Sequence, residues 1–537
     1  MNSFIEVTLS RGNSQAWSDR STPDYFVFSS STGTLRLRKR TAYPQTFAYI
    51  QEGWLYFGYG DSGLEKQILN QSLDTVPEDT FYDEEFLIGR INCLTNECTI
   101  QRDAISTVPL FIGIQKHLFI LSNKYERVYE QLDASALHIN EHCLAALVFG
   151  EITAGITLIQ EIDTLTERSR AIWTGHSYEH QSPPHSSIIH IAEQRNGNPH
   201  TFRKRFEQTL DRYWQRYSKD GQVGAELSGG MDSSSICGYY ALRGHDISSI
   251  TLTYHDTYQT SVLHKLAILQ KSFGIQSQPI SMDPKNEYPL VTMARKNTWQ
   301  PFYHGETPYT ASLDKALAYL QQKGVHTLFQ GQGGDELFDN LPQLEQENFN
   351  NPPFLPLLTA PSYITNDFRD FAGNLFTVHL KPATIGLIPQ SMIIAKLGNN
   401  IYLDRDIWPV TPLTDPKLYV YCQSLPIEYR ANRTIMQAYL HARGFPKDIY
   451  QPTIHEHFGR FFDSAVQYGL TSVFMELMQD SVLAGMGFID PELAIQSWNS
   501  EIASTAEDKD ELFKLYCLIL IEINLRFLDT TRYKIKS

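Results

Sequence analysis

A stretch of small and hydroxylated residues, Ala225 to Cys237, holds side chains whose types and spacing could do chemistry. It reads AELSGGMDSSSIC: an apolar approach, two glycines, one carboxylate and three serines. Glycines let the backbone approach a ligand closely, and free N–H groups at a helix start bind anions. Serine hydroxyls can add further donors. We therefore predict a phosphate-binding loop, made of Leu227, Ser228, Gly229, Gly230, Asp232, Ser233 and Ser234.

The acid in this loop predicts a metal ion. The loop has no lysine and is not a Walker A loop, and a carboxylate beside phosphates is repulsive unless a cation such as Mg²⁺ lies between them. A second turn, GQGGDE, repeats bare backbone followed by an acid. A tight strand-to-helix connection explains one such turn, but two copies favour a ligand site. We predict Asp232 and Asp335 as Mg²⁺ ligands around a pyrophosphate, with Gly331, Gly333 and Gly334 as binding backbone.

The elements that must position these loops alternate between strand and helix from about residue 200. Apolar strands are expected at 222–227, 247–255 and 325–330, and helices at 233–244 and 261–274. This alternation predicts a parallel sheet covered on both faces, with ligands beyond the carboxyl ends of its strands. Thr251 and Thr253 lie in the second strand, and we predict that they take part in nucleotide binding.

The first 178 residues have a different texture, with β-branched and aromatic runs bounded by glycine and proline. Residues 176–200 contain five histidines among Ser, Pro and Asn. Their irregular spacing favours a polar linker over a metal site.

Length and charge narrow the function classes. The 537 residues predict two or three domains, and a net charge of −15 argues against a nucleic-acid partner. The N-terminal residues do not resemble a signal peptide. The apolar run LYCLILIEINLRFL is broken by Glu522 and Arg526, which predicts a buried helix and no membrane partner. Six scattered cysteines without zinc spacing predict reduced thiols and a cytoplasmic protein.

Four segments carry a resemblance to a known family. SGGMDSS resembles the pyrophosphate loop of asparagine-synthetase-type ATP pyrophosphatases, and GQGGDELF resembles their second signature. IQRDAISTVPLF is similar to a segment of that family's glutaminase domain, and VTPLTDPKLYVYCQSLP to one of its synthetase domain. The resemblance implies ATP and Mg²⁺ as cofactors, adenylation of a carboxylate, release of pyrophosphate and attack by an amine.

The resemblance also implies the fold class. An α+β glutaminase-like (Ntn-type) sandwich would occupy residues 1–178. A linker would span 179–200. An α/β parallel-sheet ATP pyrophosphatase (adenine nucleotide α-hydrolase-like) domain would occupy 201–537.

Departures from the family pattern indicate the kind of member. A working glutaminase has Cys after the initiator Met, whereas this chain has Asn2 and Ser3 and no Cys before Cys93, so we expect no glutamine hydrolysis. Gln332 stands where relatives carry Glu or Tyr; Gln can orient a substrate but cannot take a proton.

The family's lysine that stabilises the reacting acyl group is also missing from the matching stretch, YQPTIHEHFGRFF. His455, His457 and Arg460 stand there, and either Arg460 or a protonated histidine could replace it. The alternative is that they are polar surface groups. The predicted catalytic residues are therefore Gln332, His455 and Arg460.

Without an ammonia source, the amine must already be on the substrate. This favours ATP-dependent, intramolecular amide formation on a ribosomally made precursor peptide, as in lasso-peptide macrolactam cyclases, with a leader peptidase and a leader-binding protein as further partners. A β-lactam-synthetase-like or asparagine-synthetase-like small-molecule ligase is the alternative enzyme. A nucleotide-binding scaffold or sensor is the alternative from another class, and the presence of both acids favours an enzyme.

Overall fold

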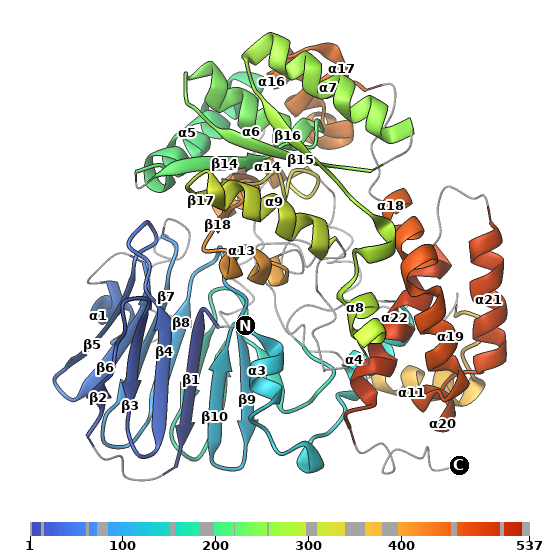
Figure 1. Cartoon of the computed structure of the whole chain (residues 1–537). Coiled ribbons are helices and arrows are strands. Elements are labelled where there is room, and N and C mark those ends of the chain that lie inside the picture. The colour runs from blue at the N-terminus through green and yellow to red at the C-terminus, as the bar shows by residue number, and fades with distance from the viewer. Residues whose placement is uncertain are drawn as a thin grey trace.

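The computed structural model describes residues 3–11, 16–60, 64–71, 84–150, 156–181, 198–219, 221–254, 257–296, 309–338, 360–377, 396–452, 459–504 and 510–528. Two antiparallel sheets come from the first 181 residues, and a parallel sheet follows (Figure 1).

The N-terminal part is a sandwich of two antiparallel sheets. Both are given in spatial order. The first consists of β11 (Ile162–Thr164), β9 (Phe111–Gln115), β10 (Leu118–Ser122), β1 (Ile5–Ser10), β4 (Gly33–Arg38), β3 (Tyr25–Ser29) and β2 (Ser18–Asp19). The second consists of β13 (Tyr178–Gln181), β12 (Arg170–Trp173), β8 (Cys98–Arg102), β7 (Leu87–Asn92), β6 (Trp54–Tyr59) and β5 (Thr46–Gln51).

The sandwich buries one face of each sheet against the other. Alternate residues of β1 point inward, as the period of a strand requires, and Ile5, Val7 and Leu9 share one core with Leu55 and Leu87 of the facing sheet. Helix α1 (Leu64–Leu69) packs on β7 and β8, and α3 (Tyr125–Tyr129) on β9 and β10. The strand-rich α+β prediction for this part is therefore confirmed as a two-sheet sandwich with a helix on each outer face.

The second part is built on a parallel sheet in the order β16 (Ser277–Ser281), β15 (Ser248–Thr253), β14 (Gln222–Glu226), β17 (Val325–Phe329) and β18 (Trp408–Val410). Helix α9 (Thr310–Gln322) covers one face, and α5 (Pro199–Tyr217), α6 (Met231–Leu242) and α7 (Thr257–Phe273) lie on the other (Figure 1). The predicted parallel sheet is confirmed. The edge strands β16 and β18 were not predicted, because polar SQPIS and the three-residue WPV lack an apolar strand pattern.

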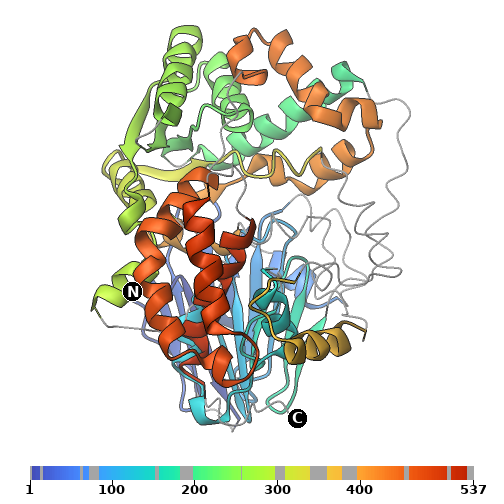
Figure 2. The ribbon, with the colours of Figure 1, turned by 90° about the vertical axis from the view of Figure 1, so that its right-hand side faces the viewer.

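A group of helices from the end of the chain lies to one side of the sandwich in Figure 1 and in front of it in Figure 2. It comprises α18 (Gly459–Ala465), the π-helical turn Val466–Leu470, α19 (Thr471–Gln479), α20 (Val482–Gly485), α21 (Pro491–Ala503) and α22 (Asp510–Leu525). Helix α22 packs against α4 (Glu141–Val148) of the N-terminal part. Leu518 to Ile521 are at most 1% exposed, which confirms the predicted buried helix. No helix among the described residues is long and apolar enough to cross a membrane.

The remaining helices connect these layers. They are α8 (Pro289–Lys296), α11 (Asn366–Thr377), α13 (Asn400–Asp404), α14 (Pro416–Gln423), α15 (Ile427–Arg430), α16 (Thr434–Ala442) and α17 (Lys447–Tyr450). Between the predicted boundaries at 178 and 200, β13 runs to Gln181 and α5 begins at Pro199. The two domain boundaries themselves stay predictions. All six cysteines are free and five are buried, as expected of reduced thiols.

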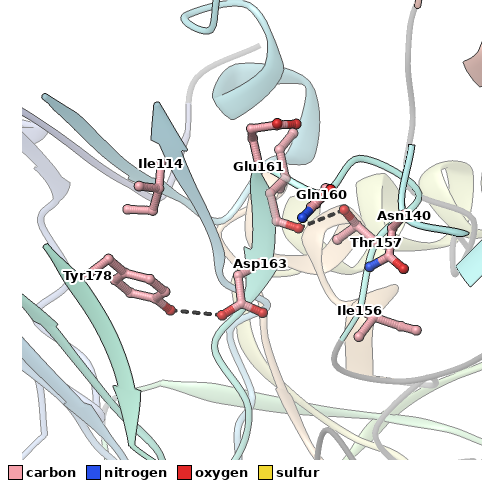
Figure 3. A pocket seen from close by; sticks show the side chains of 9 residues that line it. Ile114, Asn140, Ile156, Thr157, Gln160, Glu161, Asp163 and Tyr178 are labelled. Carbon is pink, nitrogen blue, oxygen red and sulfur yellow. Dashed lines mark hydrogen bonds between the residues drawn. The ribbon is translucent and has the colours of Figure 1, made fainter. Parts of the chain in front are cut away.

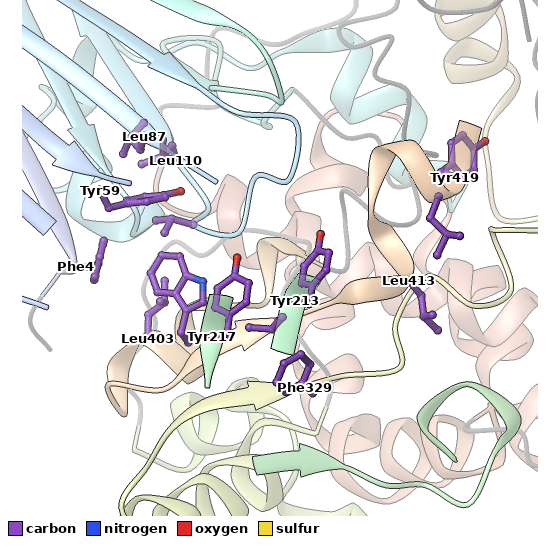
Figure 4. Packing of buried hydrophobic residues seen from close by; sticks show 14 of the residues in the cluster. Phe4, Tyr59, Leu87, Leu110, Tyr213, Tyr217, Phe329, Leu403, Leu413 and Tyr419 are labelled. Atoms are coloured by element: carbon purple, nitrogen blue, oxygen red, sulfur yellow. The ribbon is translucent and has the colours of Figure 1, made fainter. Parts of the chain in front are cut away.

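Aromatic residues join the sandwich to the parallel-sheet part (Figure 4). The indole of Trp408 lies 5.2 Å from the ring of Tyr59, centroid to centroid, and donates its N–H to the Glu85 carboxylate at 3.2 Å. The hydroxyls of Tyr217 and Thr107 donate to the same carboxylate. A buried charge with this many donors fixes how the two parts meet.

Candidate active site

The first glycine loop follows the central strand. Strand β14 ends at Glu226, and the N–H of Leu227 donates to the carbonyl of Ile250 at 2.8 Å. Gly229 has φ +84°, a conformation that glycine adopts without strain, and Gly230 then caps the start of α6.

Two serines tie the ends of this loop together. The hydroxyl of Ser233 accepts the N–H of Ser228 at 3.1 Å and lies 3.0 Å from the Ser228 hydroxyl. Ser233 and Ser234 are buried in the first turn of α6. Four of the predicted phosphate-binding residues, Ser228, Gly229, Gly230 and Ser233, therefore form one compact turn beyond the end of β14.

The second glycine loop lies directly against the first. Strands β14 and β17 are parallel neighbours, so their carboxyl ends meet at one edge of the sheet. A Cβ on Gly331 would lie 2.6 Å from the backbone nitrogen of Ser233, and a Cβ on Gly334 would overlap the carboxylate of Asp232. Glycine is thus required at both positions by close approach. The structure brings the two predicted loops together as expected.

The two predicted metal ligands share one cation. The guanidinium of Arg433 contacts Asp232 through one terminal nitrogen and Asp335 through the other. The side chains of Asp232 and Arg433 are each 20% exposed, whereas that of Asp335 is 74% exposed. Burial raises the pKa of Asp232 to about 7; Arg433 opposes this effect and Asp335 adds to it.

A half-buried carboxylate, Glu226, holds the two strand ends together behind the loops. Glu226, the last residue of β14, accepts the hydroxyl of Tyr402 at 2.7 Å and the side-chain amide of Gln330 at 3.2 Å. Burial raises the pKa of Glu226. Since Gln330 precedes the second glycine loop, this hydrogen bond ties the ends of β14 and β17 to each other.

The residues present fit a Mg²⁺–pyrophosphate group. The carboxylates of Asp232 and Asp335 lie close enough to contact one guanidinium, that of Arg433, and a metal ion could take its place. Carboxylate oxygens are ligands that Mg²⁺ prefers. The hydroxyl of Ser234 and Oε1 of Gln332 are buried without a hydrogen-bond partner in the described part of the chain. Buried polar atoms of this kind are normally satisfied, so their presence beside the loop is consistent with a polar ligand.

Two other predicted nucleotide-binding residues already have partners within the sheet. The Thr251 hydroxyl donates to the carbonyl of Leu227 and lies 2.7 Å from the hydroxyl of Ser277. The Thr253 hydroxyl donates to the carbonyl of Ile280 at 3.4 Å. These contacts position the end of β15 next to the first loop, and the assignment of both residues to ATP stays a prediction.

The other predicted catalytic residues are only partly placed. His455 and His457 lie outside the described residues. Arg460 lies near the start of α18, but its side chain is outside them as well. Gln332 lies within the second loop. The replacement for the family's lysine therefore stays a prediction.

Sequence reasoning missed two basic residues next to the loops. Arg433 is separated from Asp232 by 201 positions and belongs to no glycine turn, so no local pattern indicated it. The first loop lacks a lysine of its own, but α7 brings Lys265, whose buried stem would lie 3.2 Å from a Cβ on Gly229. Only a helix-spacing argument that placed α7 over the loop could have suggested Lys265.

A cavity of about 360 Å³ lies elsewhere, at the β11 edge of the sandwich (Figure 3). Tyr178 donates its hydroxyl to Asp163 there at 2.9 Å, and Ile114, Ile156 and Ile162 supply apolar walls. None of the predicted site residues lines it. The glycine loops are therefore the better candidate for the reaction.

Comparison with known protein families finds a match for one part of the chain. Residues 201–382 match the family model described as asparagine synthase. The matched residues are about a third of the 537-residue chain. This match indicates an ATP-dependent ligase that forms amide bonds. No curated protein matches its sequence.

Solved structures show weaker likenesses. NMN synthetase from Francisella tularensis is 11% identical, with 64% of this chain and 98% of that one covered and a TM-score of 0.26. Glutamine-dependent NAD⁺ synthetase from Acinetobacter baumannii, in complex with ADP, is 14% identical, with 63% and 62% covered and a TM-score of 0.20. Glutamine PRPP amidotransferase from B. subtilis is 11% identical, with 54% and 77% covered and a TM-score of 0.19. TM-scores this low do not establish a shared fold.

Proposed function

We propose that this protein is an ATP-dependent ligase that activates a carboxylate as its adenylate, releases pyrophosphate, and joins the activated carbonyl to an amine of the same molecule. The substrate we favour is a ribosomally made precursor peptide, and the product a macrolactam of the lasso type. The observation that carries the proposal is the contact between the two glycine loops, which brings Asp232 and Asp335 onto one cation.

The residues of the site have distinct tasks in this reaction. The backbone of Ser228, Gly229 and Gly230 would hold the pyrophosphate, as N–H groups at a helix start do. Asp232 and Asp335 would hold Mg²⁺, which neutralises phosphate charge when bound. Gln332 would orient the acyl group by hydrogen bonding, because an amide cannot serve as a base.

The start of the sandwich supports an amine that does not come from glutamine. Ser3, 2% exposed, immediately precedes the backbone N–H groups of Phe4 and Ile5, which both donate to Asn123 Oδ1. A buried hydroxyl here cannot do the work of a glutaminase thiol at the surface of a pocket. We infer that the sandwich is a glutaminase-like domain kept for its structural contacts with the ligase domain.

The test is to incubate the protein with ATP, Mg²⁺ and a candidate precursor peptide. We expect AMP, pyrophosphate and product in equal amounts, with a product one water lighter than the peptide. Free ammonia should not compete, because a tethered amine can reach effective concentrations on the order of 10⁵ M.

Other products would assign another function. A primary amide that depends on added ammonia indicates an asparagine-synthetase-like ligase. Cyclisation of a small amino acid without any peptide turnover indicates a β-lactam-synthetase-like enzyme. ADP and phosphate as products contradict the pyrophosphate-loop assignment, and nucleotide binding without turnover of any substrate indicates a scaffold or sensor.

A further inference from the structure

Arg433 occupies a position between the two predicted metal ligands. Its two terminal nitrogens contact Asp232 and Asp335 separately, so one guanidinium links acids that come from two different strand ends. In the described part of the chain neither acid has another ion pair. When both carboxylates are ionised, they and the guanidinium carry a single net negative charge at the point where the function requires a divalent cation.

The backbone around Arg433 is held in a specific conformation. Arg433 and Asn432 have φ +57° and +52°, the left-handed region that side-chain-bearing residues rarely adopt. The carbonyl of Asn432 accepts the Gln437 amide at 2.8 Å, and the Thr434 hydroxyl donates to the carbonyl of Glu428 at 2.7 Å. Strain of this kind persists only where surrounding contacts impose it, and it is commonly found at functional sites.

The surroundings of the Arg433 guanidinium offer little solvent to stabilise its charge. It is only 20% exposed, and its Nε is buried without a hydrogen-bond partner in the described part of the chain. A guanidinium enclosed in this way depends on the two carboxylates for most of its electrostatic stabilisation. If a metal ion takes the carboxylates, Arg433 needs a new anion nearby, and a pyrophosphate group on the first loop would provide one.

We propose that Arg433 competes with divalent metal ions for the carboxylates of Asp232 and Asp335. A metal ion that binds alone would be excluded, whereas a metal ion that binds together with a phosphate chain would displace the guanidinium. Metal alone would have to displace a guanidinium and leave it unpaired. Metal with pyrophosphate supplies both the competing cation and the anion that then receives Arg433. Binding of metal and nucleotide is therefore coupled, and this coupling rests on the proposed function of the two acids.

Binding of Mn²⁺, followed by its electron paramagnetic resonance signal, tests the proposal without any turnover. The wild type should bind Mn²⁺ weakly alone and at least ten-fold more tightly with inorganic pyrophosphate present. Arg433→Met, which keeps an apolar stem but removes the charge, should bind Mn²⁺ alone about ten-fold more tightly than wild type. Adding Asp232→Asn to that variant should abolish the gain.

Arg405→Met is the matched control. Arg405 pairs with Asp314 of α9 through Nε and a terminal nitrogen, at 2.7 and 2.6 Å, and its removal should leave Mn²⁺ binding unchanged. Arg433→Lys keeps one charge but cannot bridge both acids, and it should lie between wild type and Arg433→Met. If Arg433→Met does not fold, Mn²⁺ binding by Arg433→Lys tests the proposal in its place.

The proposal is wrong if a folded Arg433 variant binds Mn²⁺ alone no more tightly than wild type. It is also wrong if wild-type binding does not respond to pyrophosphate. If Mn²⁺ and pyrophosphate bind to the wild type in the coupled way expected here but no amide forms, the result counts against the substrate proposed above and not against the role of Arg433.

Discussion

The backbone of Gly334 lies directly against the carboxylate of Asp232, so that a Cβ at position 334 would overlap both Cγ and Oδ1 of that side chain. This contact joins the two glycine loops at the residue predicted to bind metal. Asp232 cannot move away freely, because Arg433 and the first turn of α6 hold it.

We expect Gly334→Ala to reduce pyrophosphate release by on the order of ten-fold or more. The added methyl must displace Asp232, and overpacking a tight contact of this kind costs about 1–3 kcal/mol. The measurement is the initial rate of pyrophosphate formation, with the melting temperature recorded beside it. Gly485→Ala is the matched control, because nothing lies within 4 Å of a Cβ there, and it should leave the rate unchanged.

Asp232→Asn and Asp335→Asn should each abolish activity and leave the fold intact, because each removes one charged ligand from the metal. Circular dichroism would report the fold, and the rate at increasing Mg²⁺ would report the metal. Asp314→Asn changes a half-exposed acid that pairs with Arg405, and it should behave like wild type. Near-normal turnover in either site variant would remove the metal assignment.

Glutamine should not serve as a source of nitrogen. Neither Asn2 nor Ser3 supplies a thiol. Asn2 lies outside the described residues, and Ser3, just before β1, is buried with its hydroxyl 3.4 Å from that of Ser122. Incubation with glutamine should therefore release no glutamate above the rate of the buffer alone. Glutamate formed in step with product would contradict this and return the sandwich to a catalytic role.

Stability should fall as the pH rises from about 4 to 7. Burial, together with the negative charge of Glu85, raises the pKa of Asp103 to about 7 from an ordinary value of 3.8. A carboxyl with a raised folded pKa contributes stability that is present below the unfolded pKa and is lost as the pH rises through the folded one.

Asp103→Asn isolates this effect. The variant removes the titration while keeping one acceptor for the N–H groups of Phe86 and Ser106, which now donate to the carboxylate. The melting temperature of the variant should therefore fall less than that of the wild type between pH 5 and 7.5. Lys396, whose pKa burial lowers to about 8, titrates above most of this window. Parallel curves for the two proteins would show that Asp103 does not carry the dependence.

The sequence by itself determined the features that depend on neighbouring residues. Paired glycines before an acid, at Gly229–Asp232 and Gly333–Asp335, indicated both loops, since backbone freedom and charge spacing are local properties. The apolar periods predicted the central strands, the helices beside them and the buried helix α22. This was possible because the buried face of a strand or helix carries apolar residues at a regular spacing.

Only the tertiary structure decided which distant residues share the site. Pairing of β14 with β17 placed Asp232 beside Asp335, and the fold of the loop before α16 delivered Arg433 from 201 positions away. Glu85 accepts a hydrogen bond from Trp408, 323 positions away, and a periodic sequence pattern cannot predict a contact of that kind. Long-range contacts are set by the packing of whole layers, so the sequence predicted the parts of this site, and packing determined the cation that joins them.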